Sequence, residues 1–428
     1  MSIGGYDCAF SRARDTASAA LGLDAMRASS ALRYSCNDRP DSAAREASSS
    51  RMPSGTFRIV MDTDMPAFYR PRLHYACTPS RTARPYAGGV TNTASIVLVA
   101  NAGDSSISTF RFADGRLERL AVTEGLTGCS TFVVDRDFVY AGVKGEPAGI
   151  VTLLLNREDG TLTPISRLDL PSGGMNYLAL TRGGDVLLGA SYGGGYGIVC
   201  RVAEGSIGAP VARIAYPNLH SVLASPDGRF AYFVSLGADL IAQYALGDDL
   251  ALTPLDPPTV AAPAGSGPRH LVIDDAREGV YVMTEFSGEV LHFRRDAGDG
   301  ALSLAGAASA IDTAASLGHS EFGADPLAHH YIWGADLHLA GEVLWASERT
   351  ESTLAAVPVA ADGTVTDATA VTVTEEQPRG FAVSPDGRYL VAAGERSTTV
   401  SLYAVDGDRL DLRQRIETGR GANWVRFV

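Results

Sequence analysis

The sequence has 428 residues, 45% hydrophobic and 20% charged, so it holds enough apolar material for a large core or two domains and is not mainly disordered. Its formal net charge of −13 gives no electrostatic reason to bind DNA, RNA or an anionic membrane surface. Neither a membrane-spanning apolar run nor a secretory signal is visible, so we expect a cytoplasmic protein.

Residues 1–92 differ in composition from the rest of the chain. They carry twelve Arg against eight Asp or Glu, a net charge of +4 that leaves −17 on residues 93–428. The segment is rich in Ser, Ala and Arg, and its apolar residues are mostly alanine, so we predict a low-complexity, largely disordered extension. A misassigned start codon and a functional tail are equally open explanations for it. We place the folded domain at residues 93–428.

The cysteines and histidines predict neither disulfides nor a metal site. Five Cys are an odd number, and none has the CxxC or CxxH spacing of a zinc site. Cys129 and Cys200 are therefore expected to be reduced, partly buried thiols. His329 and His330 are adjacent and would point apart on any regular element, which makes a poor metal pair. We expect no cofactor.

Other catalytic motifs fail on their spacing. A phosphate-binding loop of the Walker type requires Gly-Lys, but Lys144, the only lysine in the sequence, follows Val143. The GHSEFG stretch from Gly318 places its second Gly one residue too late for a nucleophile elbow and lacks the strand-to-helix context.

An internal repeat dominates the remainder of the sequence. Each copy has a short apolar run, a Gly or Asp turn, a second apolar run, a Gly, Ser or Asn break, and a third alternating run. The runs are rich in Val, Leu, Ile, Tyr and Phe and are bounded by turn formers, which is typical of strands. The copies begin at Ile96, Phe132, Leu178, Val222, Leu271, Leu337 and Phe381.

The repeat period indicates a seven-bladed β-propeller, an all-β fold. Most copies start 40 to 50 residues apart, a length that fits four short strands per blade. In the SPDGR turns, Pro226 and Pro385 suit a fixed φ, and Gly228 and Gly387 suit a positive one. An all-β sandwich with a second domain is the alternative, but it would need fewer regular repeats.

The two ends of the repeat region predict that the ring closes. The first copy lacks an innermost strand before SIVLVAN, whereas the chain ends in a strand of that type, Trp424 to Val428. Pairing of this strand with the first copy would remove the open edge of a partial ring.

One position of the repeat carries unusual residues. Five residues ahead of Ser225, Asp274 and Ser384 it holds His220, Arg269 and Arg379. Since this position precedes the innermost strand, its occupants should gather at one mouth of the central channel. Polar residues can also simply cap strand ends and contact water, but two arginines and a histidine in the same register of an acidic protein favour an anion site. The other copies hold Ser130, Asn176 and Ala335.

Glu285 is a further candidate, at the end of the second strand of the copy that begins with Arg269. Glu348 and Glu395 occupy comparable places, so a carboxylate there can equally be a feature of the repeat. If Glu285 faces the channel, it would combine with Arg269 and His220 into an acid/base pair and an anion holder within one concave site.

Four stretches resemble the seven-bladed propeller lactonases, a family that includes propeller-type bacterial 6-phosphogluconolactonases and fungal carboxy-muconate lactonizing enzymes. The resemblance spans residues 94–428 in order and rests on HSVLASPDGRFAYFVSLGADLI, GPRHLVIDDAREGVYVMTE, QPRGFAVSPDGRYLVAAGE and the terminal NWVRFV. The functional His, Arg, Glu and Arg of the family fall on His220, Arg269, Glu285 and Arg379. Two departures are Thr284, where many members have Asn, and a longer stretch at 300–334, which could overhang the site.

The resemblance implies a lactonase, with 6-phospho-D-glucono-1,5-lactone as the expected substrate. It assigns Arg269 and Arg379 to a phosphate, carboxylate or oxyanion, and His220 and Glu285 to acid/base chemistry, without deciding which accepts the first proton. His270 is expected to point away from Arg269, because side chains alternate along a strand. A carboxy-muconate cycloisomerase and a non-catalytic propeller scaffold are the alternatives. We expect a monomer whose partner is a small anionic lactone.

Overall fold

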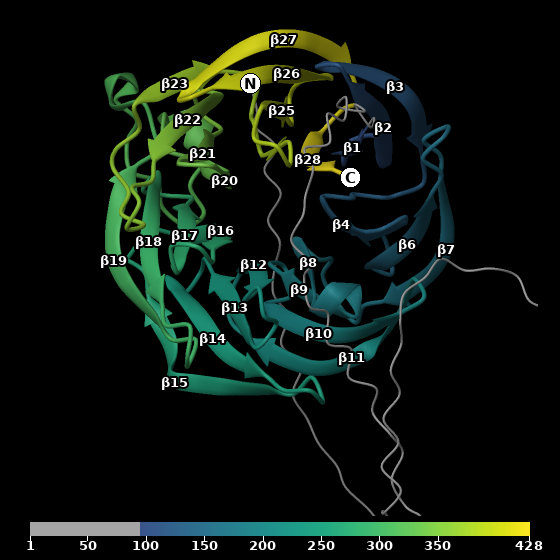
Figure 1. Ribbon diagram of the computed structural model, residues 1–428, viewed down its shortest axis with the longest axis horizontal. Helices are drawn as coiled ribbons and strands as arrows, with labels where there is room; N and C mark the ends of the chain where they lie inside the picture. The colour runs from purple at the N-terminus through teal and green to yellow at the C-terminus, as the bar shows by residue number, and fades with distance from the viewer. Residues whose placement is uncertain (1–94) are drawn as a thin grey trace, which may run out of the picture. The chain divides into compact units, whose positions relative to one another are not determined.

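The computed structural model describes residues 95–428, which form a ring of seven four-stranded antiparallel sheets (Figure 1). The predicted extension, including Cys8, Cys36 and Cys77, lies outside the described residues. No helix of the described part is long and apolar enough to cross a membrane. The prediction of an all-β, seven-bladed propeller is confirmed.

The blades follow the chain, and each runs from the channel outward. Blade 1 contains β28 (Ala422–Phe427), β1 (Ser95–Asn101), β2 (Ser106–Ala113) and β3 (Arg116–Thr123). Blade 2 contains β4 (Thr131–Asp135), β5 (Phe138–Val143), β6 (Gly149–Leu155) and β7 (Leu162–Asp169). Blade 3 contains β8 (Tyr177–Thr181), β9 (Val186–Ser191), β10 (Tyr196–Ala203) and β11 (Ser206–Ala215). Blade 4 contains β12 (Leu219–Ala224), β13 (Phe230–Ser235), β14 (Leu240–Leu246) and β15 (Leu252–Ala261).

The remaining blades keep the same order. Blade 5 contains β16 (Pro268–Asp274), β17 (Gly279–Thr284), β18 (Glu289–Arg295) and β19 (Leu302–Ser309). Blade 6 contains β20 (Gly334–Ala340), β21 (Val343–Glu348), β22 (Thr353–Pro358) and β23 (Ala370–Val373). Blade 7 contains β24 (Gly380–Val383), β25 (Tyr389–Ala393), β26 (Thr399–Asp406) and β27 (Arg409–Glu417). The short helical turns are η1 (Arg182–Gly184), η2 (Thr313–Ala315) and α1 (Pro326–His329).

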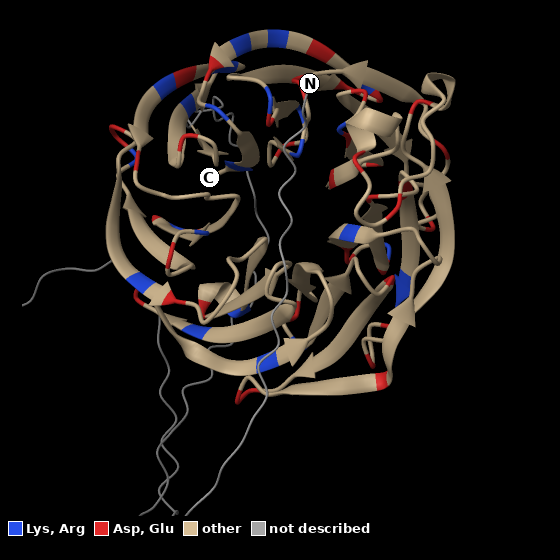
Figure 2. Cartoon of the chain, turned by 180° about the vertical axis from the view of Figure 1, so that it is seen from behind, with Lys and Arg blue, Asp and Glu red and all other residues tan. Residues whose placement is uncertain are grey.

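Burial explains why these runs form strands. The second strand of a blade is packed between two neighbouring blades, so its residues are apolar on both faces; all six residues of β13 are buried. The outermost strands alternate, as in β11, because one face packs on the blade and the other meets water. Lys, Arg, Asp and Glu accordingly lie mostly on the outer strands and the loops (Figure 2).

Ring closure occurs as the sequence predicts. β28, the last strand of the chain, pairs antiparallel with β1, so Val425 lies opposite Val99. The indole of Trp424 is buried and donates a hydrogen bond from Nε1 to the carbonyl of Phe132, 2.8 Å away in blade 2. The closing strand therefore joins two blades at once, and it leaves no unpaired inner edge in blade 1.

The predicted turns are also present. Gly228 and Gly387 have φ of 70° and 71°, and in each turn the preceding serine hydroxyl donates to the aspartate two residues later at 2.6 Å. Cys129 and Cys200 are free and buried, as expected.

Candidate functional site

Two rings of equivalent positions surround one mouth of the channel. The inner ring is the position that the sequence analysis singled out, next to the start of each innermost strand. Strand pairing places seven residues there, one per blade from blade 1 to blade 7: Asn423, Ser130, Asn176, His220, Arg269, Ala335 and Arg379.

The second ring consists of the first residue after the second strand of each blade or, in blade 7, the second residue after it. Most of them donate a backbone hydrogen bond to the residue two places before the inner-ring residue, as Glu285 does to Gly267. Its members, from blade 1 to blade 7, are Ala102, Lys144, Tyr192, Leu236, Glu285, Arg349 and Glu395.

A β-bulge directs several inner-ring side chains. At Arg269 the register of β16 against β17 shifts, so Arg269 is an extra residue between Pro268 and His270. His220 in β12 and Asn423 in β28 interrupt their strands in the same way. Bulges locally re-aim side chains, which fits their use beside a binding site.

Arg269 and Glu285, two of the predicted site residues, form a buried ion pair. Nε of Arg269 donates to Oε2 of Glu285 at 2.8 Å. Arg349, which the sequence analysis missed, holds the same oxygen with Nη2 at 3.1 Å and lies over the ring of Trp333. The carboxylate of Glu285 is therefore held between two guanidinium groups, and its second oxygen, Oε1, is left without a hydrogen-bond partner among the described residues.

The charges around Glu285 keep it ionised. Burial alone would raise the pKa of this carboxyl group, but the positive charges of Arg349, Arg269 and Arg379 outweigh burial and lower its pKa. Burial and the neighbouring Arg349 lower the pKa of Arg269 to about 9, so Arg269 is still a cation at neutral pH. The cluster thus carries fixed charges in its resting state.

Arg379 lies across the mouth and pairs with a different carboxylate. Its Nη1 donates to Oε1 of Glu395 at 3.0 Å, and the two side chains are 26% and 21% exposed. The side chain of Arg269, by contrast, is 1% exposed. Of the two predicted arginines, Arg379 is the one that a solute in the channel can reach.

The expectation that His270 points away from Arg269 is wrong. Its Nε2 lies 3.1 Å from Nη1 of Arg269, and its ring meets the ring of His220 edge-on with centroids 5.0 Å apart. The bulge at Arg269 is the reason, because it breaks the alternation of side chains on which the expectation relied.

A buried acid sets the hydrogen bonding of His270. Nδ1 of His270 lies 2.7 Å from Oδ1 of Asp336, whose other oxygen is 3.2 Å from Nε2 of His338. Burial, reinforced by the charge of Arg269, lowers the pKa of His270 to about 3, so the ring is neutral. Its Nδ1–H then donates to Asp336, and its Nε2 accepts from Arg269. Asp336 thus orients His270, and His270 in turn contacts the guanidinium of Arg269.

His220 is neutral as well. It is 4% exposed and meets the ring of Tyr192 edge-on at 5.6 Å. Burial and the charge of Arg269 place its pKa well below the usual value. Its Nδ1 is buried without a hydrogen-bond partner in the described part of the chain.

The prediction that Glu348 occupies the same place in its blade as Glu285 does in blade 5 is also wrong. Glu348 is the last residue of β21 and faces Gly334, so it corresponds to Thr284, and the counterpart of Glu285 is Arg349. Glu348 instead accepts backbone hydrogen bonds from Trp333, Thr350 and Glu351. Glu395 does occupy the place equivalent to Glu285.

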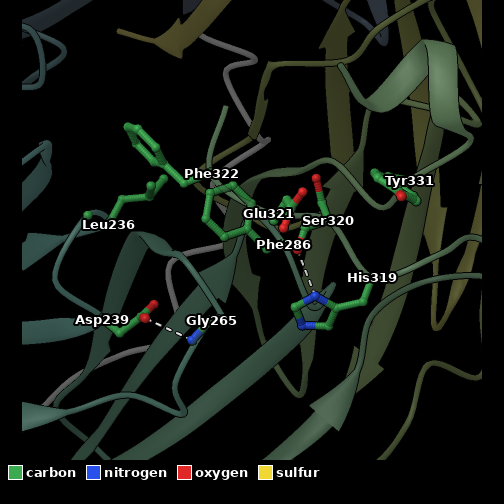
Figure 3. Close-up of a pocket in the computed structure, with 10 residues that line it drawn as sticks. Leu236, Asp239, Gly265, Phe286, His319, Ser320, Glu321, Phe322 and Tyr331 are labelled. Carbon is green, nitrogen blue, oxygen red and sulfur yellow. Dashed lines mark hydrogen bonds between the residues drawn. The ribbon is translucent and has the colours of Figure 1, made fainter. Parts of the chain in front are cut away.

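The 300–334 stretch supplies β19 and then a wall beside the mouth. Ser320 donates its backbone N–H to the carbonyl of Phe286, the residue after Glu285. Between this wall and blade 4 lies a pocket of about 370 Å³, toward which Phe322 extends (Figure 3). Because Leu236 belongs to the second ring, the pocket adjoins the mouth. Its lining is Leu236, Gly237, Asp239, Gly265, Phe286, His319, Ser320, Glu321, Phe322 and Tyr331.

The four predicted residues thus lie around one mouth, in two groups. Arg269 and Glu285 are bonded directly, and His220 reaches them through His270. Arg379 is paired with Glu395 on the neighbouring side. Among residues 95–428 no group of three or more His, Cys, Asp or Glu is placed to hold a metal ion.

Asn423, the inner-ring residue of blade 1, was not predicted from the sequence. In the other blades a turn after the innermost strand marks the inner-ring position, whereas no such turn follows Asn423 in the sequence. Arg349 and Lys144 were missed because no turn motif marks the end of the second strand. The signal that finds all three is the register between the first two strands of each blade.

Comparison with known proteins identifies the family. Residues 86–427 match the family model "Lactonase, 7-bladed beta-propeller". A 6-phosphogluconolactonase from Cronobacter sakazakii is 30% identical over 299 residues, which are 68% of this chain and 84% of that protein. One from Klebsiella pneumoniae is 28% identical over 320 residues, 73% of this chain and 92% of that protein.

Solved structures agree with the family match. A candidate 6-phosphogluconolactonase from Bacteroides fragilis superposes with a TM-score of 0.69 at 25% identity, over 80% of this chain and 99% of that one. A periplasmic gluconolactonase from Pseudomonas aeruginosa gives a TM-score of 0.68 at 24% identity, over 78% of this chain and 99% of that one. The chain therefore belongs to the seven-bladed β-propeller lactonase family.

Proposed function

We propose that this lactonase hydrolyses 6-phospho-D-glucono-1,5-lactone to 6-phosphogluconate, the lactonase step of the pentose phosphate pathway. The observation that carries the proposal is the cationic mouth: Arg269, Arg349, Arg379 and Lys144 against Glu285 and Glu395, in a chain whose net charge is −13. This cationic mouth attracts a small anion, whereas the acidic remainder of the protein repels it. The names of the 6-phosphogluconolactonases that it resembles support the same substrate.

In the proposed reaction, Glu285 acts as general base. It is ionised, and its Oε1 is without a partner in the described chain, so it can take the proton of a water that attacks the lactone carbonyl. The carbonyl C–O double bond becomes an oxyanion next to Arg379, the accessible guanidinium. When the intermediate collapses, the ring C–O bond breaks and protonated Glu285 returns the proton to the departing ring oxygen.

The other predicted residues are proposed to support Glu285. Arg269 is buried, and its Nε and Nη1 are used by Glu285, His270 and the carbonyl of Ala335, so we treat it as a positioning residue. His220 is neutral and has one donor and one acceptor nitrogen, which suits the orientation of the attacking water. A neutral imidazole of such low basicity is a weaker proton acceptor than the carboxylate.

The test measures the rate at which 6-phosphogluconolactone is hydrolysed and subtracts the spontaneous rate. It compares the native protein, Arg379→Ala and a charge-matched control. Arg119, exposed on β3 and free of ion pairs in the described chain, supplies the control Arg119→Ala. We expect the native protein and the control to accelerate hydrolysis and Arg379→Ala to be at least tenfold slower. Equal rates in all three would overturn the sugar-phosphate proposal. A parallel assay of carboxy-muconate cyclisation then tests the alternative chemistry of the family, which closes a ring without consuming water.

We also propose that the protein works in the cytoplasm as a monomer, on a small anionic lactone and without a nucleic-acid or membrane partner. The free thiols of Cys129 and Cys200 support a reducing compartment. Cell fractionation and light scattering of the purified chain test the two statements. Recovery in the periplasm, or a mass of two chains, would contradict them.

A further inference from the structure

Lys144, the only lysine of the sequence, lies at the mouth of the channel. It follows β5 and occupies the second ring in blade 2, the place that Glu285 occupies in blade 5 and Arg349 in blade 6. The side chain is exposed, whereas the buried parts of blade 2 around it are apolar. The repeat therefore presents an ammonium group to the same space that the catalytic carboxylate faces.

Lys144 differs from the arginines of the mouth in having no carboxylate of its own. Arg269 and Arg349 share Glu285, and Arg379 holds Glu395. The ammonium of Lys144 forms no hydrogen bond or ion pair with the described residues. It is thus an uncompensated cation at the mouth of a protein that is acidic overall.

The stem of Lys144 is packed so that the ammonium has a defined direction. A Cβ added to Gly128 would lie 3.1 Å from Cβ of Lys144, and one added to Gly174 would lie 2.6 Å from its Cγ. Two glycines therefore leave just enough room for the stem on either side. Such packing removes part of the rotamer entropy that an exposed lysine would lose on binding an anion.

The neighbouring positions leave space beside Lys144. Ala102 is the second-ring residue of blade 1, between Lys144 and the blade of Arg379, and its methyl group fills little of the mouth. Asn423 and Ser130, the inner-ring residues of blades 1 and 2, are 4% and 7% exposed, and Oδ1 of the first and Oγ of the second are buried without partners in the described chain. Both atoms are closed off from solvent, so a ligand at the mouth would contact the ammonium of Lys144 and not these two oxygens.

We propose that Lys144 forms the subsite for the phosphate group of the lactone substrate. The inference rests on the proposed function and adds to it: Glu285 and Arg379 act on the lactone ring, while the 6-phosphate is anchored across the mouth in blades 1 and 2. A lysine ammonium is a compact point charge with three donors, suited to a phosphate that arrives in more than one rotamer. Although the side chain is exposed to the channel, the surrounding protein withdraws the ammonium from bulk water, and this desolvation together with the charge of Arg379 lowers the pKa of Lys144 to about 8. The ammonium is therefore still mostly protonated at neutral pH.

The experiment compares two substrates that differ only in the phosphate, 6-phosphoglucono-1,5-lactone and glucono-1,5-lactone. The variants are Lys144→Met, Lys144→Arg and the charge-matched Arg119→Met on the outer strand β3. Hydrogen bonds to charged groups contribute about 1.5–3 kcal/mol, so Lys144→Met should raise KM for the phosphorylated lactone roughly 10- to 100-fold. It should leave kcat for that lactone and both constants for glucono-1,5-lactone within about twofold. Lys144→Arg should restore most of the affinity, and Arg119→Met should behave as the native protein.

Inorganic phosphate provides a second readout that does not depend on turnover. We expect it to inhibit the native protein competitively and to lose most of this inhibition in Lys144→Met. An unchanged KM and unchanged phosphate inhibition in Lys144→Met would overturn the subsite, while native activity on the phosphorylated lactone would leave the proposed function standing. If the native protein itself shows no activity on the phosphorylated lactone, the proposed function fails first, and phosphate inhibition of glucono-1,5-lactone hydrolysis then decides whether Lys144 binds an anion.

Discussion

Blades 5 to 7 and blades 1 to 3 place the same backbone positions at the channel mouth, but they fill them with different chemistry. In blades 5 to 7 every charged member of the two rings has an opposite charge within hydrogen-bonding distance, as Glu285 has in Arg269 and Arg349. In blades 1 to 3 the rings carry small or neutral residues and one ammonium, Lys144, without a carboxylate. The charged side chains of blades 5 to 7 are thus paired with one another, whereas blades 1 to 3 hold one positive charge without an ion-pair partner.

The difference shows how a repeat can build an asymmetric site. The backbone of each blade delivers a side chain to the mouth with nearly the same geometry, so only residue identity decides what each sector does. In blades 5 to 7 the paired charges hold a carboxylate in a fixed place, which is what a reacting group needs. In blades 1 to 3 the ammonium of Lys144 has no ion-pair partner and is suited to bind an anionic group of the substrate.

Loss of the carboxylate charge in the paired sector should affect catalysis most. Glu285→Gln keeps the shape of the side chain but removes the proton acceptor, and general bases contribute about 10²- to 10⁴-fold to the rate. We expect kcat to fall by that factor on phosphorylated and unphosphorylated lactone alike, with KM changed little. Steady-state kinetics on both substrates checks it, with Glu118→Gln on the exposed strand β3 as the control. A kcat within threefold of native would remove Glu285 from the mechanism.

Removal of the acid behind the paired sector should cost stability and then activity. Asp336 bonds His270 at 2.7 Å and is 4% exposed, so Asp336→Asn, which removes a buried hydrogen bond to a charged acceptor, should destabilise the fold by about 1.5–3 kcal/mol. The exposed pair of His330 and Glu351 has nearly the same length, 2.6 Å, and Glu351→Gln should cost less than about 1 kcal/mol. Denaturant unfolding of both variants checks the difference. Equal losses would mean that burial does not govern these two pairs.

Acidification should weaken the paired sector through its histidines. The pKa of His270 is lowered to about 3 and that of His220 also lies well below the usual value of 6.5, so the unfolded chain binds protons that the folded chain does not. Their contribution to stability is therefore complete above about pH 6.5 and is lost as the pH falls, by about 1.4 kcal/mol per pH unit for each histidine. Unfolding measured between pH 7 and 5 should show a shallower slope in His270→Gln than in the native protein. A slope in His270→Gln identical to native would contradict the neutral state of His270.

The pocket beside blade 4 should matter least for the phosphorylated lactone. Phe322 is 61% exposed, so Phe322→Ala should change the free energy of unfolding by less than about 0.5 kcal/mol. Since the pocket lies on the side of the mouth away from Lys144, we expect kcat/KM for this substrate to stay within threefold. A much larger loss would place part of the substrate in the pocket, in contact with the 319–331 wall.

The sequence allowed the seven blades, the closing strand and the inner ring to be predicted, because each rests on a local pattern. Apolar runs, SPDGR turns and the unmatched terminal strand are all readable without knowledge of packing. Inner-ring residues such as His220 and Arg269 could be aligned because they stand at a fixed distance from those turns.

The remainder of the site depends on features that no short pattern marks. The position of His270 follows from a one-residue bulge, and the role of Glu348 follows from where β21 ends. Arg349 and Lys144 face the mouth only because of the register between the first two strands. The pocket needs a contact between Ser320 and Phe286, which are separated in the sequence by β18, β19 and the turn η2.

If one sector performs the chemistry and the other holds the phosphate, substitutions in the two sectors must affect the preference for the phosphorylated substrate differently, and a ratio measures this preference. The ratio is kcat/KM for 6-phosphoglucono-1,5-lactone divided by kcat/KM for glucono-1,5-lactone, measured in the native protein, Glu285→Gln and Lys144→Met. We predict a ratio well above one in the native protein, the same ratio in the much slower Glu285→Gln, and a ratio at least tenfold lower in Lys144→Met. A ratio that is unchanged in Lys144→Met, or that falls equally in both variants, would contradict the account.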